Sequence, residues 1–295
     1  MNTCKIPKIV LTDRNGYEFL ARFDSKFSKL TNSGIVIDFD NCDMFDANLS
    51  SALGALLDRL VSRSNSVYLK LRDDHDVTKS LSRNGFLTAW SHGFTEEEKE
   101  NFIIYRKFHR NNSSEFKEYV DAWLISKQKF PKHTDLAGEK ILESIFEIYA
   151  NAVTHGETDY VYCCGEYKPD TSSLDMTIVD CGTTIPSNVN NFLYSKGLDV
   201  LSPTDAIKWA FVSGNTTKQY AGGLGLAILK DFVRMNNGCL QMVSGTAFLD
   251  FSSESMESYL LDVSFPGTIV NMKFNFNDNK NYFMESERVN LNDLL

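Results

Sequence analysis

Strand-like and helix-like apolar segments alternate through the first ninety residues. SGIVIDFDNC (33–42) has the dense apolar content of a buried strand that enters a turn. NLSSALGALLDRLVSRS (48–64) follows with its leucines on one helical stripe, and SVYLKLR (66–72) is a second strand. A strand, a helix and a strand joined by short turns predict a right-handed parallel crossover. We therefore expect a small α/β domain over residues 1–92.

The pattern changes between residues 93 and 132, where charged and aromatic residues dominate. Thr95 and Glu98 have the spacing of a capping box, which indicates a helix start with Glu96 to Glu98 in its solvated first turn. NNSSEFKEYVDAWL (111–124) restarts a helix after a polar break. We expect a helical linker over 93–132 and a domain boundary within it.

A second α/β domain is expected over 133–276, with 277–295 as a tail or a short docking helix. LAGEKILESIFEIYANAVTHG (136–156) predicts one long amphipathic helix, closed by a glycine C-cap at Gly156. A strand pair around the polar turn PDTSS (169–173) follows it. Further helices are predicted at 202–214 and 223–238, and further strands at 239–245, 258–267 and 268–276.

Composition narrows the class of protein. The composition, 42% hydrophobic and 23% charged, is as expected of a soluble globular protein. The length of 295 residues suits two domains of ordinary size or one large domain. Its formal charge of −9 argues against a general nucleic-acid binder, which needs a basic face. Without a run of 18 apolar residues or a secretory signal pattern, no membrane association is expected, and the cytoplasm is the default location.

The six cysteines lack the spacing of metal ligands. We interpret the adjacent pair Cys163-Cys164 as two small apolar residues of a buried strand, in preference to a redox site.

Candidate chemistry begins in EIYANAVTHG (147–156), where Glu147, Asn151 and His155 recur at a spacing of four and so share one helix face. An amide oxygen suits Mg²⁺ that is also bound by phosphate oxygens. A carboxylate one turn away can orient or deprotonate an attacking water or hydroxyl. The alternative is a polar helix face that only meets solvent. His155 is assigned a structural role.

Two later segments add binding elements. Asp180 ends an apolar strand, where its carboxylate can accept a hydrogen bond from an exocyclic amine, and Gly182 lets the backbone approach a flat ring. Gly222, Gly223 and Gly225 stand before a helix, where free backbone N–H groups can cradle phosphate. Both segments also have a purely structural interpretation. The first would be a common Asp-x-Gly turn at the end of a strand, and the second would be a flexible loop before a helix.

In this order, the three motifs resemble the ATP-binding domain shared by gyrase, Hsp90, histidine kinases and MutL, the GHKL family. The resemblance covers roughly 136–274 and is closest to the histidine-kinase and anti-sigma-factor type. It implies a two-layer α/β sandwich, with a mixed sheet on one side and helices on the other, that binds ATP and Mg²⁺.

The resemblance also implies residue roles. Glu147 matches the catalytic acid, Asn151 the Mg²⁺ ligand and Asp180 the reader of adenine, while Gly182 is intact. Thr184 replaces the second glycine of the family's Asp-x-Gly-x-Gly segment, which crowds that loop. The second glycine box matches the four residues Gly223, Leu224, Gly225 and Leu226.

Two further positions follow from the family pattern. Lys218, in the segment that corresponds to the lid over the triphosphate, could reach the γ-phosphate, or it is a solvated loop lysine. Thr268 occupies a position where the family often has a threonine near the base, or it is a β-branched strand residue.

The N-terminal segment 35–60 resembles the STAS fold of anti-sigma-factor antagonists. That family carries Asp-Ser-Ser-Gly in the turn, and a partner kinase phosphorylates the second serine. Here the turn reads Asp46, Ala47, Asn48, Leu49, so no hydroxyl occupies the acceptor position, and Ser50 and Ser51 lie just beyond it. The phosphorylation switch is therefore expected to be lost.

These patterns predict an ATPase or a protein serine/threonine kinase in a regulatory pathway, with a protein partner. GHKL relatives often dimerise, so a homodimer is a further expectation. The alternatives are a nucleotide-gated interaction module with little turnover and a scaffold with a decayed pocket, which only Thr184 supports. A sensor histidine kinase is not expected, because His109 is not within a heptad pattern.

Overall fold

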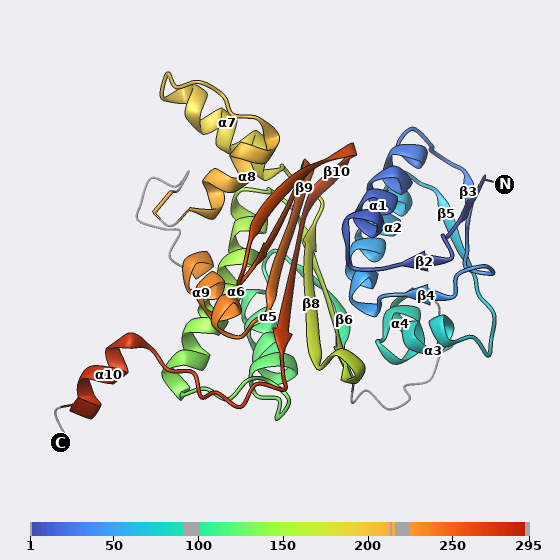
Figure 1. Cartoon of the computed structure of the whole chain (residues 1–295). Coiled ribbons are helices and arrows are strands. Elements are labelled where there is room, and N and C mark those ends of the chain that lie inside the picture. The colour runs from blue at the N-terminus through green and yellow to red at the C-terminus, as the bar shows by residue number, and fades with distance from the viewer. Residues whose placement is uncertain (1, 91–100, 213, 216–224, 293–295) are drawn as a thin grey trace.

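The layers of the protein are a small sheet, a pair of helices, a large sheet and an outer group of helices (Figure 1). The structure is a computed structural model, and it describes residues 2–90, 101–212, 214–215 and 225–292. The fold is mixed α/β with several sheets, as the sequence predicts.

The N-terminal part is built on parallel strands. Its sheet has the order β1-β3-β5, with all pairs parallel, and α1 and α2 form the crossovers. This confirms the parallel strand, helix and strand unit that the sequence predicts. The bounds are β1 (Asn2–Lys5), α1 (Arg14–Phe27), β3 (Gly34–Asp38), η1 (Ala47–Leu49), α2 (Ser50–Ser62) and β5 (Ser66–Lys70). A two-stranded parallel sheet and two short helices complete it: β2 (Ile9–Val10), β4 (Met44–Phe45), α3 (Asp76–Arg83) and α4 (Phe86–Trp90).

The large sheet has the order β6-β7-β8-β10-β9, and every neighbouring pair is antiparallel. Its strands are β6 (Phe102–His109), β7 (Tyr160–Lys168), β8 (Ser173–Asp180), β9 (Cys239–Ser252) and β10 (Met256–Asn275). The expectation of a mixed sheet is wrong, because short turns join β7 to β8 and β9 to β10 as hairpins, and β10 then pairs with β8. The two strands predicted at 258–267 and 268–276 are one strand, β10, with register shifts between Leu260 and Thr268.

The prediction of a helical linker over 93–132 is wrong for residues 102–109. Phe102–His109 is an edge strand that pairs with β7, and its charged Arg106 and Lys107 are exposed, which hides the strand pattern. The helix predicted to restart here is confirmed as α5 (Ser113–Val120), and it continues into a π-helical turn at Asp121–Ile125. The capping box of Thr95 and Glu98 lies outside the described residues.

The long predicted helix is confirmed as α6 (Asp135–Thr154), with the Thr134 side chain capping its start. Gly156 is not a left-handed cap, since the residue with positive φ is Glu157 (54°). The remaining helices are α7 (Ile185–Ser195), α8 (Pro203–Phe211), α9 (Gly225–Met235) and α10 (Glu285–Asn292). None of the helices in the described ranges is long and apolar enough to cross a bilayer.

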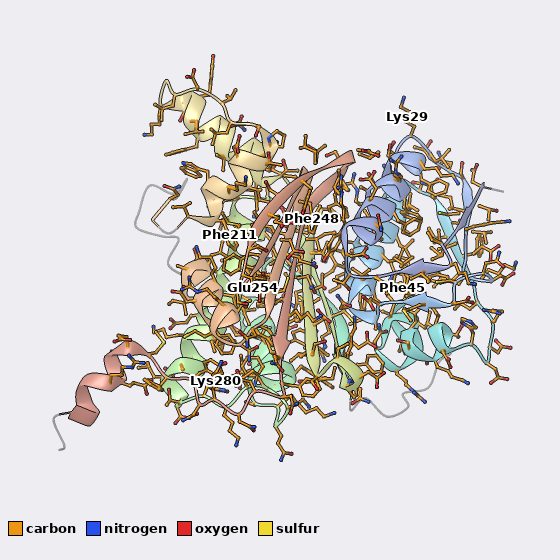
Figure 2. All side chains as sticks on the ribbon, viewed as in Figure 1. Lys29, Phe45, Phe211, Phe248, Glu254 and Lys280 are labelled. Carbon is orange, nitrogen blue, oxygen red and sulfur yellow. The ribbon has the colours of Figure 1, made fainter. Side chains whose placement is uncertain are left out.

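Both faces of the large sheet are buried. Residues such as Ile178 and Val270 pack toward α6 and α9, whereas their neighbours Val179 and Ile269 join the core around α1 and α2. Figure 2 shows the same division, with Phe248 between the sheet and α1 and with Phe211 on the opposite side. The sheet is therefore shared by both halves of the chain and not covered on one face only.

This shared core predicts cooperative unfolding. Phe265 is fully buried in the core between the sheet and the N-terminal helices. We expect Phe265→Ala to lower the free energy of unfolding by about 3–5 kcal/mol, the usual cost of a large core truncation. Calorimetry is expected to show a single transition for the wild type and the variant, with equal calorimetric and van't Hoff enthalpies.

The control is Tyr68→Ala, because Tyr68 lies on the small sheet and is 52% exposed. It is expected to change stability by about 0.5 kcal/mol or less. Two separate transitions, of which Phe265→Ala shifts only one, would show that the halves unfold independently.

Candidate functional site

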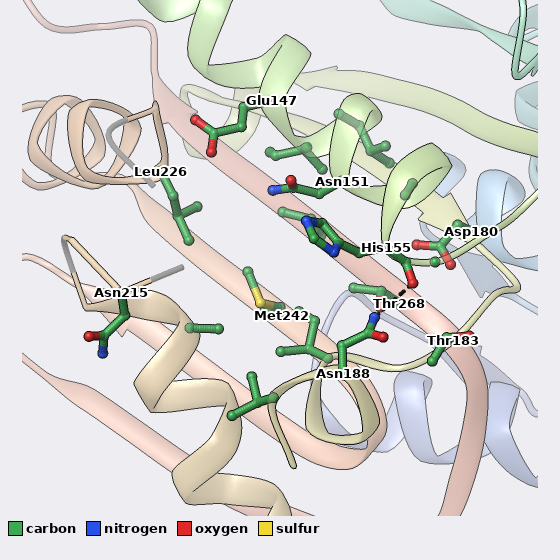
Figure 3. Close-up of a pocket in the computed structure, with 18 of the residues that line it drawn as sticks. Glu147, Asn151, His155, Asp180, Thr183, Asn188, Asn215, Leu226, Met242 and Thr268 are labelled. Atoms are coloured by element: carbon green, nitrogen blue, oxygen red, sulfur yellow. Dashed lines mark hydrogen bonds between the residues drawn. The ribbon is translucent and has the colours of Figure 1, made fainter. Parts of the chain in front are cut away.

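A cavity of about 1050 Å³, including its open mouth, lies between α6, α8 and the large sheet (Figure 3). Its walls are largely apolar, with a few polar groups at defined places. The polar lining includes Glu147, Asn151, His155, Asp180, Asn188 and Thr268.

Helix α6 supplies one wall. Its apolar face, including Ile141, Ile145 and Tyr149, is buried against the sheet. Glu147, Asn151 and His155 are half-buried and follow one another along the cavity, from the side of Leu226 to the side of Asp180. The row predicted from the spacing of four therefore lines the cavity.

Asp180 ends β8 at the opposite end of this row. Its Oδ1 accepts a hydrogen bond of 2.8 Å from the Gly182 N–H, and the residue is only 6% exposed. Burial raises the pKa of this carboxyl to about 7, although the Gly182 hydrogen bond acts in the opposite direction. The carboxylate is thus held in place but poorly solvated, as suits an acceptor for a ligand donor.

The loop after Asp180 requires two glycines. A Cβ on Gly182 would lie 1.9 Å from the Gly156 carbonyl oxygen, and a Cβ on Gly156 would lie 2.5 Å from the Ala152 oxygen. The Thr183 N–H donates to the Gly156 carbonyl at 2.7 Å. Gly156 and Gly182 therefore join the end of α6 to the loop that carries Asp180, which is a different role for Gly156 from the predicted helix cap.

Thr268 lies directly across the strand pair from Asp180, since the two are register partners on β10 and β8. Its Oγ1 lies 2.8 Å from Ser244 Oγ, and Ser244 Oγ accepts a hydrogen bond of 2.8 Å from the Ile185 N–H. This hydroxyl pair connects β9, β10 and the start of α7.

Thr184 has a structural role. Among the described residues, Thr183 rather than Thr184 lines the cavity. Thr184 is the N-cap of α7, and its Oγ1 accepts from the Ser187 N–H at 3.3 Å. The residue that replaces the expected glycine therefore starts a helix and is not a ligand contact in this cavity.

The second glycine box is described only in part. Gly225 is the first residue of α9, and Leu226 lines the cavity. Lys218, Gly223 and Leu224 lie outside the described residues.

Sequence reasoning missed Asn188, Trp209, Met242 and Ser244. Asn188 lies one turn into α7, and its Nδ2 donates to the His155 carbonyl oxygen at 2.8 Å, which links α7 to the end of α6. The N-cap pattern of Thr184 and Ser187 could have placed Asn188 on the first turn of a helix. Nothing in the sequence indicates that this turn meets α6.

The donor set suits a metal that is shared with a ligand. In the described part of the chain, no cluster of three or more His, Cys, Asp or Glu side chains could hold a metal ion. Asn151 offers a neutral oxygen, so Mg²⁺ here would take its other ligands from water and ligand phosphates, as Mg²⁺ commonly does.

Comparison with protein-family models, curated proteins and solved structures found no match to this chain. The assignment of the site therefore rests on the cavity and on the residues that converge on it.

The buried carboxyl of Asp180 predicts a specific pH dependence. Because the folded pKa is about 7 and the ordinary value is 3.8, folding favours the protonated form. The wild type is therefore expected to lose stability relative to Asp180→Asn as the pH rises from about 4 through 7, and the difference should level off above that range.

Denaturant unfolding at half-unit pH steps measures this difference. Asp170→Asn, which removes an exposed carboxyl from the turn between β7 and β8, is the control. A flat difference between the wild type and Asp180→Asn over this range would contradict the burial of an ionisable Asp180.

Proposed function

We propose that this protein is a GHKL-type Mg-ATP-binding protein that acts as an ATPase or as a protein serine/threonine kinase on a regulatory partner. In this proposal residues 133–276, with β6 added to their sheet, form the nucleotide-binding unit, and residues 1–92 form a STAS-like unit. One observation carries the proposal: Glu147, Asn151, Asp180 and Thr268, spread over more than a hundred residues of sequence, line a single cavity.

The base would bind at the Asp180 end. Ile178, Met242 and Val270 give that end an apolar surface that suits a flat ring. The Asp180 carboxylate accepts a hydrogen bond from an exocyclic amine, and the backbone at Gly182 allows close approach. The Thr268 hydroxyl, held by Ser244, supplies a second polar contact beside the same carboxylate.

The phosphates would extend along α6 toward Glu147 and the start of α9. Backbone N–H groups at the first turn of α9, which begins at Gly225, suit phosphate oxygens. Asn151 would hold the Mg²⁺, which neutralises phosphate charge. Glu147, one turn from Asn151, orients and deprotonates a water or a protein hydroxyl that attacks the terminal phosphate.

A separate observation favours a second candidate, a nucleotide-gated interaction module. Helices α7 and α8 contribute Asn188 and Trp209 to the cavity, and the segment between them exposes Leu198 (56%) and Val200 (62%). Tyr194, at the end of α7, is 79% exposed. If nucleotide binding moved these helices, it would alter an exposed apolar surface to which a partner protein can bind.

The test follows the γ-phosphate of labelled ATP with Mg²⁺. Wild type is expected to release phosphate or to label a protein hydroxyl, and Glu147→Ala to lower that rate by about 10²- to 10⁴-fold, the usual contribution of a general base. Nucleotide affinity in Glu147→Ala is expected to stay close to wild type. Asp180→Asn is expected to weaken affinity by about 10- to 150-fold, since a hydrogen bond to a charged group contributes about 1.5–3 kcal/mol.

Glu143→Ala is the matched control, because Glu143 is on the same helix but exposed, where it pairs with Lys140. Binding without turnover in any assay would favour the interaction module. Absence of Mg-ATP binding by the wild type would refute both candidates.

A further inference from the structure

A closed set of polar contacts lies between the N-terminal helices and the back of the large sheet, away from the cavity. We call it the polar ring. Its members from the N-terminal part are Thr12, Asp46 and Asn48, and its members from the sheet are Lys168, Asp175, Thr177 and Asn271.

Asn48 is the centre of the polar ring and is completely buried. Its Nδ2 donates to Thr177 Oγ1 on β8 at 2.8 Å, and Asn271 Oδ1 on β10 lies 3.2 Å from the same nitrogen. Thr177 Oγ1 in turn donates to Asn271 Oδ1 at 2.7 Å. One side chain from the N-terminal turn therefore contacts two neighbouring strands of the sheet.

Charged groups close the ring. Thr12 Oγ1 accepts from Asn48 Nδ2 at 3.0 Å and donates to Asp46 Oδ2 at 2.7 Å. Lys168 Nζ lies 2.8 Å from Asp46 Oδ1 and 3.4 Å from Asp175 Oδ2. Asn271 Nδ2 donates to Asp175 Oδ1 at 3.4 Å, which completes the circuit. Asn48, Asp175, Thr177 and Asn271 are buried, and the other three members are partly exposed. A polar network that is buried at its centre and in which every member has a partner favours one relative position of the two surfaces.

The polar ring and the cavity lie on the same two strands. Thr177 and Asn271 are register partners, and three residues along each strand Asp180 and Thr268 are register partners too. Side chains alternate between the faces of a strand, so the first pair faces the N-terminal helices and the second pair faces the cavity. The position of one pair constrains the other through a short length of paired backbone.

We propose that Asn48 is a positioning residue for nucleotide binding, through which the N-terminal unit holds β8 and β10 in the arrangement that presents Asp180 and Thr268. This rests on the proposed nucleotide function. Asn48 touches neither the nucleotide nor the metal, and it acts only through Thr177 and Asn271. By linkage, nucleotide bound in the cavity tightens the docking of the N-terminal unit by the same factor.

The proposal also bears on the acceptor of any phosphate transfer. The turn at Asp46–Leu49 that resembles a STAS acceptor turn is buried against the sheet at Ala47, Asn48 and Leu49. Its side chains are bonded to the strands behind the cavity, not directed into it. In this proposal the hydroxyl that accepts the phosphate belongs to another protein or to an exposed part of this chain. The N-terminal unit instead positions β8 and β10 from the face of the sheet opposite the cavity.

Asn48→Ala and Asn65→Ala test the proposal as a matched pair in the full-length chain. Asn65 is also buried (5% exposed), and its side chain bonds Ser33, Leu30 and Leu60, all within the N-terminal unit. Both variants are expected to lose stability. Only Asn48→Ala is expected to weaken Mg-ATP affinity, by about 2- to 30-fold, the range for residues that act on a site from outside it. Hydrogen exchange at the amides of 178–180 and 268–270 should rise in Asn48→Ala alone.

A second pair covers the case in which Asn48→Ala does not fold. Thr177→Val removes the hydroxyl with little change in shape, and Thr177→Ser retains it. The valine variant is expected to weaken Mg-ATP affinity, and the serine variant to restore it to near the wild-type value.

The possible outcomes distinguish a failure of the positioning role of Asn48 from a failure of the proposed nucleotide function. Equal affinity losses in Asn48→Ala and Asn65→Ala, or wild-type affinity in Thr177→Val, overturn the positioning role. If the wild type does not bind Mg-ATP, the proposed function fails, and hydrogen exchange at the same amides still decides whether Asn48 orders the two strands.

Discussion

The large sheet can bury both of its faces because successive residues of each strand point to opposite sides. On β8, Ile178 belongs to the core under α6 and α9, while Val179 belongs to the core under α1 and α2. The same alternation places Asp180 beside the cavity and Thr177 in the polar ring. A shift of one residue in register would exchange these sets, so the pairing of β8 with β10 determines both the site and the interface.

Different kinds of contact hold the neighbouring elements against the two faces of the large sheet. Toward the cavity, glycine contacts and a hydroxyl pair bring the loop after β8 close to α6 and α7. Toward the N-terminal helices, an apolar core surrounds a polar network that contains a lysine and two aspartates. Apolar contacts tolerate sliding, whereas a polar network in which every member has a partner is compatible with few arrangements. We therefore expect the network to restrict the relative position of the two surfaces and the apolar core to contribute most of the stability of the interface.

Local patterns were sufficient where a single element decides the outcome. The spacing of four predicted the face of α6 that lines the cavity, and the hydrophobic runs predicted the parallel unit at the N-terminus. Sequence reasoning failed where contacts between residues far apart in the sequence determine the structure. The sequence of β6 does not predict a strand, because Arg106 and Lys107 interrupt its apolar pattern at an exposed sheet edge. The sequence around Asn48 shows only that it has no hydroxyl for phosphorylation, because no nearby residue indicates that Thr177 and Asn271 are its partners.

The path of β10 has an evolutionary consequence. Its second half pairs with β8 beside the cavity, while its first half lies against α1, where Arg14 donates to the Leu260 carbonyl oxygen and Asp262 pairs with Arg22. One continuous strand thus contacts residues from the start of the chain along one half and lines the cavity along the other. An unrelated N-terminal unit would leave this strand and its sheet face without the contacts that α1 and α2 make in this chain. The two units are therefore expected to diverge together, with compensating substitutions across their boundary, and to be inherited as a single module.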